Sequence, residues 1–187
     1  MRKLLVFNSV TVDGYFTDKN NDMSWAHRQS DLEWDEFVAG NARSGGELLF
    51  GRVTYEMMAS FWPTPAAAQQ FPEVAAGMNN SPKVVFSRSL DSVSWQNTRL
   101  MKGNLADEVR KLKDEPGDHL VIMGSGSIIS QLALENVIDE YQLVVNPIVL
   151  GTGRTIFEGI KEKLKLKLTS SREFSNGNVL LCYRPAA

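Results

Sequence analysis

The sequence predicts an α/β protein with a mostly parallel central sheet, flanked by helices and closed by a C-terminal antiparallel hairpin. Three observations support this prediction. Short apolar runs alternate with helix-like segments along most of the chain, which is typical of a parallel sheet. The last two apolar segments are joined at Asn176-Gly177, a strong hairpin signal. The length of 187 residues suits one domain spanning residues 1–187.

The first half of the chain is expected to supply three strands and their helices. Residues 3–12 are rich in apolar and β-branched types and end at the turn signal Asp13-Gly14. Ser30 is expected to cap the first helix, because Glu33 three residues later completes a capping box. The patterns then predict strand 47–50, helix 53–61, a loop over 63–70, a short helix ending before Pro82 and strand 83–87.

The second half continues the alternation and then changes to strands alone. Asn104 is the expected N-cap of an amphipathic helix over 104–114. The run "HLVIMGSGSIISQLALEN" predicts a strand, a glycine turn and a helix. The remaining elements are a short strand at 98–102, a strand over 139–151 and two tail strands within 165–184.

Composition and charge exclude several classes of protein. The chain is 43% apolar with a net charge of −2 and no basic block, which argues against a nucleic-acid partner. No apolar run approaches the length of a membrane span, and Asn8 interrupts the short apolar stretch after the N-terminus, so no signal peptide is visible. The single cysteine, Cys182, fits a reducing compartment, and no cluster has metal-ligand spacing. We therefore expect a cytoplasmic protein without a metal.

Three predicted strands end in residues suited to anions. Gly51 and Arg52 follow one strand, Ser87 and Arg88 follow another, and the run 124–127 (Gly-Ser-Gly-Ser) separates a strand from a helix. Ligands of open α/β sheets bind at the carboxyl ends of the strands, where helix N-termini offer unpaired N–H groups. Each signal also has a plain alternative, a tight turn or a solvated surface arginine. Together they predict one extended ligand with several phosphates.

At this point the sequence resembles a known family. The segments "SVTVDGYF", "LLFGRVTYE", "VVFSRSL", "IMGSGSIISQL" and "DEYQLVVNPIVLGTGRTIF" are similar, in order, to the dihydrofolate reductase-like superfamily. The branch it resembles is the reductase (C-terminal) domain of the bacterial riboflavin biosynthesis protein. The resemblance runs from residue 3 to about residue 184 and implies NADPH as the hydride donor.

The resemblance also implies which residues hold the cofactor. Arg52 would lie near the 2′-phosphate, and the adjoining helix start would hold the pyrophosphate region. Ser87 and Arg88 would contact the adenosine 2′-phosphate. The implied cofactor-binding residues are Gly51, Arg52, Val53, Thr54, Ser87, Arg88, Gly124, Ser125, Gly126 and Ser127. Dihydrofolate reductases have three consecutive glycines at the last turn, whereas this chain has Ser125 in the middle.

A second stretch, "MSWAHRQSDLEWDEF", bears on the residues expected to bind the substrate. It resembles the dihydrofolate reductase segment that carries a catalytic carboxylate, and Asp31 falls on that position. Asp31 also suits a helix start without any ligand. Asn8 and Ser9 would line the pocket floor, or simply satisfy a bulge. Trp25 would stack on a flat substrate, although packing is the alternative.

These features lead to three functional hypotheses. The first is an NADPH-dependent reductase that transfers a hydride to a small heterocyclic substrate, pterin- or pyrimidine-like. The second is the 5-amino-6-ribosylamino-pyrimidinedione phosphate reductase of riboflavin biosynthesis. The third is an NADP(H)-binding protein without turnover.

A homodimer is expected from the apolar run over 143–150, because a strand that is apolar on both faces needs cover on both. The resemblance points the same way. The alternative is that the segment over 152–163 folds back as a lid and leaves a monomer.

Overall fold

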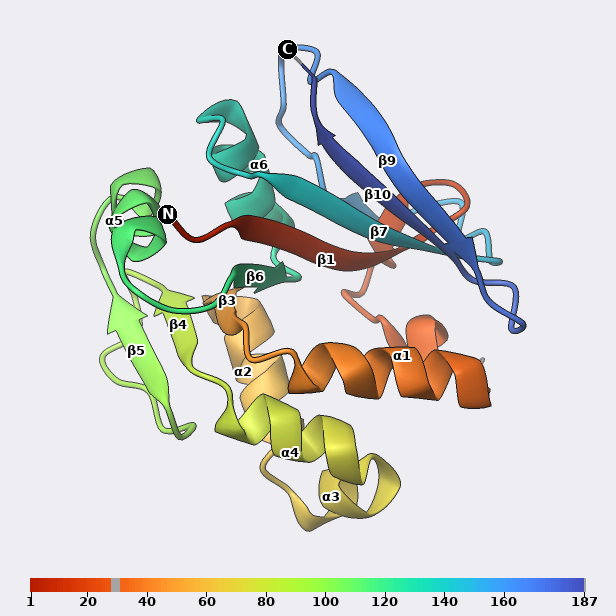
Figure 1. The fold of residues 1–187 in the computed structure, drawn as a ribbon, viewed down its shortest axis with the longest axis horizontal. Helices are drawn as coiled ribbons and strands as arrows, with labels where there is room; N and C mark the ends of the chain where they lie inside the picture. Colours follow the sequence, from red (N-terminus) through yellow and green to blue (C-terminus); the bar gives the residue numbers. More distant parts are fainter. Residues whose placement is uncertain (28–30, 187) are drawn as a thin grey trace.

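The computed structural model describes residues 1–27 and 31–186. An eight-stranded sheet lies between two layers of helices, with the strand order β5-β4-β3-β6-β1-β7-β10-β9 (Figure 1). The pairs from β5 through to β7 are parallel, and β10 is antiparallel to both β7 and β9. The predicted class, a mostly parallel α/β sheet with a C-terminal antiparallel hairpin, is confirmed.

The elements have the following bounds. The strands are β1 (Leu4–Thr11), β2 (Tyr15–Thr17), β3 (Glu47–Gly51), β4 (Lys83–Phe86), β5 (Thr98–Met101), β6 (Leu120–Met123), β7 (Glu140–Asn146), β8 (Arg154–Thr155), β9 (Leu166–Glu173) and β10 (Val179–Pro185). The helices are η1 (Ser24–His27), α1 (Leu32–Arg43), α2 (Arg52–Phe61), α3 (Pro65–Gln70), α4 (Pro72–Asn80), α5 (Leu105–Asp114) and α6 (Gly126–Leu134). None of the described helices is long and apolar enough to span a bilayer.

The two faces of the sheet are covered by different helices. Helices α5 and α6 pack on one face, where Val109 and Ile129 are fully buried against strand residues such as Val6. Helices α2 and α4 cover the other face, and α1 continues that layer over β7 and β10 (Figure 1). The right-handed crossovers of a parallel sheet explain this division, since each crossover places its helix on one face.

Two parts of the fold differ from the sequence prediction. The stretch predicted as a loop over 63–70 contains helix α3, in which Thr64 caps Ala67 N at 3.2 Å and Pro65 occupies the first turn. A polar N-cap followed by proline is a helix-start signal, so this helix could have been found. The small sheet formed by β2 and β8 was also missed, because strands of two or three residues leave no periodic pattern.

Residues of the same chain pack on both faces of β7. Val144 of β7 is buried against Phe174 and Leu180 on one face. On the other face, Leu143 packs on the main core, to which Ile156 also belongs. The segment after β7 therefore does fold back and covers the strand within one chain. The homodimer stays a prediction that only the family resemblance supports.

Candidate functional site

A deep cleft of about 1730 Å³ runs along the carboxyl ends of β1, β3, β4 and β6. These ends meet at one edge because the strands are parallel neighbours. Twelve of the predicted site residues line the cleft: Asn8, Ser9, Gly51, Arg52, Val53, Thr54, Ser87, Arg88, Gly124, Ser125, Gly126 and Ser127. We call residues 51–54, 87–88 and 124–127 the strand-end cradle.

The first part of the cradle is the start of α2. Gly51 is its N-cap and makes no side-chain capping bond, so the first N–H groups of the helix face the cleft. A Cβ at Gly51 would collide with Ser125 Oγ, so only glycine lets β3 and the glycine turn lie this close. Arg52 is exposed and forms an ion pair with Glu56 at 2.9 Å.

The second part is the glycine turn between β6 and α6. Gly124 (φ 77°) and Ser125 (φ 68°) are both left-handed, a conformation that costs a non-glycine residue about 1–2 kcal/mol. Ser125 caps α6 without a side-chain bond, which leaves the first N–H groups of this helix, those of Gly126 and Ser127, open to the cleft. Strain of this kind is kept where a ligand needs the backbone in one position.

The third part follows β4. The Ser87 hydroxyl accepts hydrogen bonds from Ser89 N at 3.2 Å and from Leu90 N at 3.1 Å, which tightens the turn. This turn presents Arg88, whose side chain is exposed and has no carboxylate partner within the described chain. Arg88 therefore differs from Arg52, because its guanidinium group is available to an anion.

Two buried polar atoms in the cleft lack a partner. Asn8 is 3% exposed, and its Oδ1 accepts a hydrogen bond from Gly124 N at 2.7 Å. That bond fixes the orientation of the amide, so Nδ2 is left as a donor without an acceptor. The Thr17 hydroxyl, which the sequence analysis did not select, is likewise buried and unpartnered. Buried polar groups are usually paired, so both atoms are available to a ligand in the cleft.

Together, these features fit a dinucleotide cofactor. The cradle supplies two open helix N-termini, an available arginine and glycines that permit close approach of the backbone. The buried donor of Asn8 lies next to the glycine turn, where a ligand carbonyl or amide could satisfy it.

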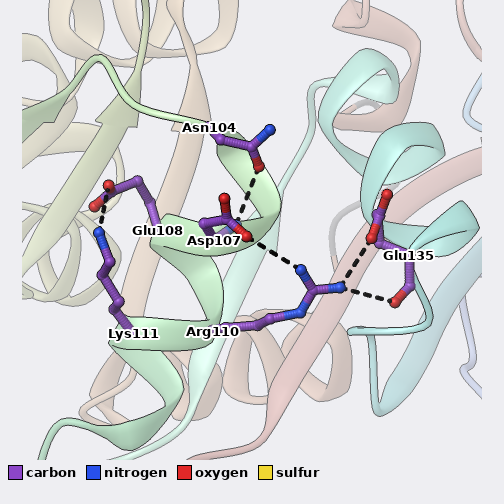
Figure 2. A network of polar contacts seen from close by, with 6 residues as sticks. All are labelled: Asn104, Asp107, Glu108, Arg110, Lys111 and Glu135. Carbon is purple, nitrogen blue, oxygen red and sulfur yellow. Dashed lines mark hydrogen bonds and ion pairs between the residues drawn. The ribbon is translucent and has the colours of Figure 1, made fainter.

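Figure 2 shows how α5 and α6 are joined beside the cleft. Asn104 caps α5 as predicted and accepts from Asp107 N at 3.2 Å. Arg110 donates to Glu135 Oε2 at 2.8 Å and lies 3.4 Å from Asp107 Oδ1 (Figure 2). Because Asn104 and Glu135 line the cleft, this network holds the two helices at a fixed spacing around it.

Asp31 and Trp25 lie outside the cleft lining. Asp31 is the N-cap of α1, and its Oδ1 accepts from Trp34 N at 2.8 Å. It therefore takes the position expected of Ser30, which lies outside the described residues. Trp25 is 7% exposed and buried in η1. One turn beyond Asp31, the carboxylate of Asp35 does line the cleft, and the sequence analysis missed it.

The fold and the cleft together define an α/β protein of the reductase-like type. The chain belongs to the RibD C-terminal domain family, which matches residues 2–180.

Known proteins extend this assignment. The protein YyaP of Bacillus subtilis (strain 168) is 28% identical over 182 residues, which cover 97% of this chain and 94% of YyaP. A solved Shewanella sp. PV-4 protein, assigned to riboflavin biosynthesis, has a TM-score of 0.74 and 23% identity and covers 99% of each chain. Dihydrofolate reductase from Enterococcus faecalis, solved with NADP(H) and RAB-propyl, has a TM-score of 0.66 and 15% identity, covering 99% of this chain and 97% of that one. These structures share the fold, which agrees with the predicted superfamily.

Proposed function

We propose that this protein is an NADPH-dependent reductase that transfers a hydride to a small heterocyclic substrate, pterin- or pyrimidine-like. The observation that carries this proposal is the convergence of three anion-binding strand ends on one cleft. A reductase of the same fold, from Enterococcus faecalis, was solved with NADP(H). We infer a cytoplasmic protein from the sequence composition.

In this proposal the chain's own residues bind and orient both ligands. The open N-termini of α2 and α6 hold the phosphates, and Arg88 pairs with the 2′-phosphate. Asn8 holds the glycine turn through Oδ1 and offers Nδ2 to a ligand carbonyl. When bound, NADPH supplies the hydride. The buried walls of the cleft keep water away from the reacting atoms.

Reduction of a C=N bond also requires a proton on nitrogen. The sequence analysis assigned this role to Asp31, but its Oδ1 is used in capping α1 and the residue lies outside the cleft lining. Asp35 and Glu36 are the α1 acids that line the cleft, and Asp35 lies one turn beyond Asp31. We therefore assign the orientation of the substrate, or of a proton-bearing water, to Asp35.

Two other functions remain as alternatives, and cofactor titration and turnover assays distinguish them. The pyrimidine reductase of riboflavin biosynthesis is the alternative that the family name suggests, and the family match does not favour it over other substrates. A non-catalytic NADP(H)-binding protein would keep the cradle and use no residue of α1.

Titration with NADPH and NADH, followed by NADPH oxidation assays with pterins and pyrimidines, tests the proposal. We expect tighter binding of NADPH, and Asp35→Asn should lower turnover by about 100-fold while leaving NADPH affinity unchanged. Asp31→Asn is the matched control and should alter stability rather than turnover. Equal affinity for the two cofactors would refute NADPH as the donor. Binding without turnover of any such substrate would favour the non-catalytic protein.

A further inference from the structure

Exposed apolar side chains gather in the cleft. Of the nine large apolar side chains exposed in the described chain, five line it: Leu32, Val53, Met57, Phe71 and Leu134. Single exposed apolar residues are ordinary on a protein surface, whereas a concentration in one concavity marks a binding surface. Water alone would leave these side chains poorly solvated, so the cleft is suited to a ligand with apolar groups.

Two of these side chains, Met57 and Phe71, lie in a part of the cleft whose other lining residues are also apolar, and we call this part the arm. It is lined by Trp34 and Val38 of α1, Met57 and Phe61 of α2, and Phe71 and Val74 at the start of α4. Met57 and Phe61 are four residues apart and so share one face of α2. The Phe61 and Phe71 rings lie 6.4 Å apart, centroid to centroid, and form an aromatic end to the arm.

The arm is not built to hold a phosphate. Arg43 is the one cationic side chain among the described residues that line the arm, and it is already ion-paired with Glu73. The acids Asp35, Glu36 and Glu73 also line this part of the cleft, so acids outnumber cations among the residues described there. A phosphate dianion entering the arm would meet like charges and lose water without gaining a free cation.

The cradle has the opposite character. Its Arg88 has no carboxylate partner within the described chain, and two helix N-termini open beside it. Within one continuous cleft, the cradle thus supplies the available arginine and the open helix N-termini, and the arm supplies aromatic and thioether side chains. This division suggests that the phosphates belong to the cofactor and the apolar groups to the substrate.

We propose that the substrate carries an uncharged apolar substituent, alkyl or aryl, that binds in the arm, and that it is not a ribose-phosphate conjugate. This proposal rests on the proposed reductase function. The flexible thioether of Met57 can adapt to substituents of different shape. Each methylene buried there should tighten binding about fourfold.

The test uses pterins that differ in one substituent: methyl, n-butyl, phenyl or phosphomethyl. Their affinities are measured by calorimetry with NADPH present at saturation. The n-butyl and phenyl probes should bind at least about tenfold tighter than the methyl probe, and the phosphomethyl probe should bind more weakly than it. No gain from the apolar substituents, including no binding by the whole series, overturns the proposal, as does preference for the phosphate. The NADPH titration on the same sample reports separately on the proposed function.

Two variants locate the effect. Met57→Glu should reduce the ratio of n-butyl to methyl affinity to about one, since it places a charge in the arm. Leu168→Glu is the matched control, because Leu168 is 50% exposed on β9 and lies outside the cleft lining. If both variants keep the wild-type ratio, the substituent does not bind in the arm and the proposal fails.

Discussion

The strand-end cradle and the arm occupy one cleft, but they are built by different means. The cradle presents backbone N–H groups, held by turns of a few residues and by two left-handed positions, Gly124 and Ser125. The arm presents side chains from three helices, α1, α2 and α4. A cradle of this kind depends on an accurate backbone, whereas the arm depends on side-chain shape and polarity. Cofactor binding should therefore be easily broken by small backbone changes, and substrate preference should be easily altered.

The largest effect is expected from Gly124→Ala. Gly124 has φ 77°, and a Cβ there would lie 3.1 Å from Thr54 Cγ2. We expect a loss of about 1–2 kcal/mol of folding free energy from the backbone alone. NADPH affinity should fall by about 100-fold, because displacing the turn removes several backbone donors worth about 1–1.5 kcal/mol each.

Gly14→Ala is the matched control for this variant. Gly14 has φ 84°, and a Cβ there would meet nothing within 4 Å. Urea unfolding should show a similar loss of stability for both variants. Cofactor titration should show a loss for Gly124→Ala alone. Equal affinities would mean that the cradle tolerates backbone displacement.

Arg88→Ala should give the next largest effect. A charge-assisted hydrogen bond is worth about 1.5–3 kcal/mol, so NADPH affinity should fall about 10- to 100-fold while NADH affinity stays the same. The measurement is fluorescence titration with each cofactor, and Arg184→Ala on β10, outside the cleft lining, is the control. A parallel loss for both cofactors would remove Arg88 from recognition of the 2′-phosphate.

A third prediction concerns Lys83, which lies outside the cleft lining and ties the end of α4 to the start of β4. Its Nζ donates to the carbonyl oxygens of Met78, Asn79 and Ser81 at the end of α4, and Lys83 begins β4. Burial lowers the pKa of Lys83 from 10.5 to about 8. Between these two pKa values the folded protein has released the proton while the unfolded chain still holds it.

The unfolding free energy should therefore rise with pH from about pH 8 to about pH 10, by ~1 kcal/mol per pH unit. Below pH 8 both states are protonated, and this contribution becomes flat. In Lys83→Met, the unfolding free energy should no longer rise with pH over this range. Urea unfolding at several pH values measures this. A slope that persists in Lys83→Met would assign the effect to another group.

The smallest effect is expected from Glu56→Gln. The ion pair between Arg52 and Glu56 spans two exposed side chains, and such pairs are worth about 0.3–0.5 kcal/mol. Releasing Arg52 should improve NADPH affinity about twofold at low salt, with no change for NADH. Titration at high salt should erase the difference. An improvement for both cofactors would show that Arg52 acts on a phosphate that they share.

Much of the cradle could be predicted because its signals are local. Gly51, Arg88 and Gly124 each follow an apolar strand directly, and parallel strands bring their carboxyl ends together. The arm could not be predicted in this way. Asp35 and Phe71 meet the same cleft only because α1 packs against α4, a contact between helices that are separated by β3, α2 and α3 in the chain.

Asp31 illustrates the limit of a local motif. The sequence stretch around it suits either a catalytic carboxylate or a helix cap, and the two uses differ only in where the helix begins. A start at Leu32 makes Asp31 the cap and turns Asp35 toward the cleft. A shift of one or two residues in a helix boundary is within the ordinary uncertainty of sequence patterns, and it decides which acid caps the helix and which one lines the cleft.

The position of β1 in the sheet has a consequence for synthesis. Its neighbours are β6, starting at Leu120, and β7, starting at Glu140, so the first strand made pairs with strands made much later. At about 5–20 residues per second, β1 waits roughly 7–30 s on the ribosome before β7 is complete. Until β6 is made, "LLVFNSVT" has neither of its neighbouring strands, and a chaperone can bind it. The cleft, whose floor is the end of β1, is therefore among the last features of the nascent chain to form.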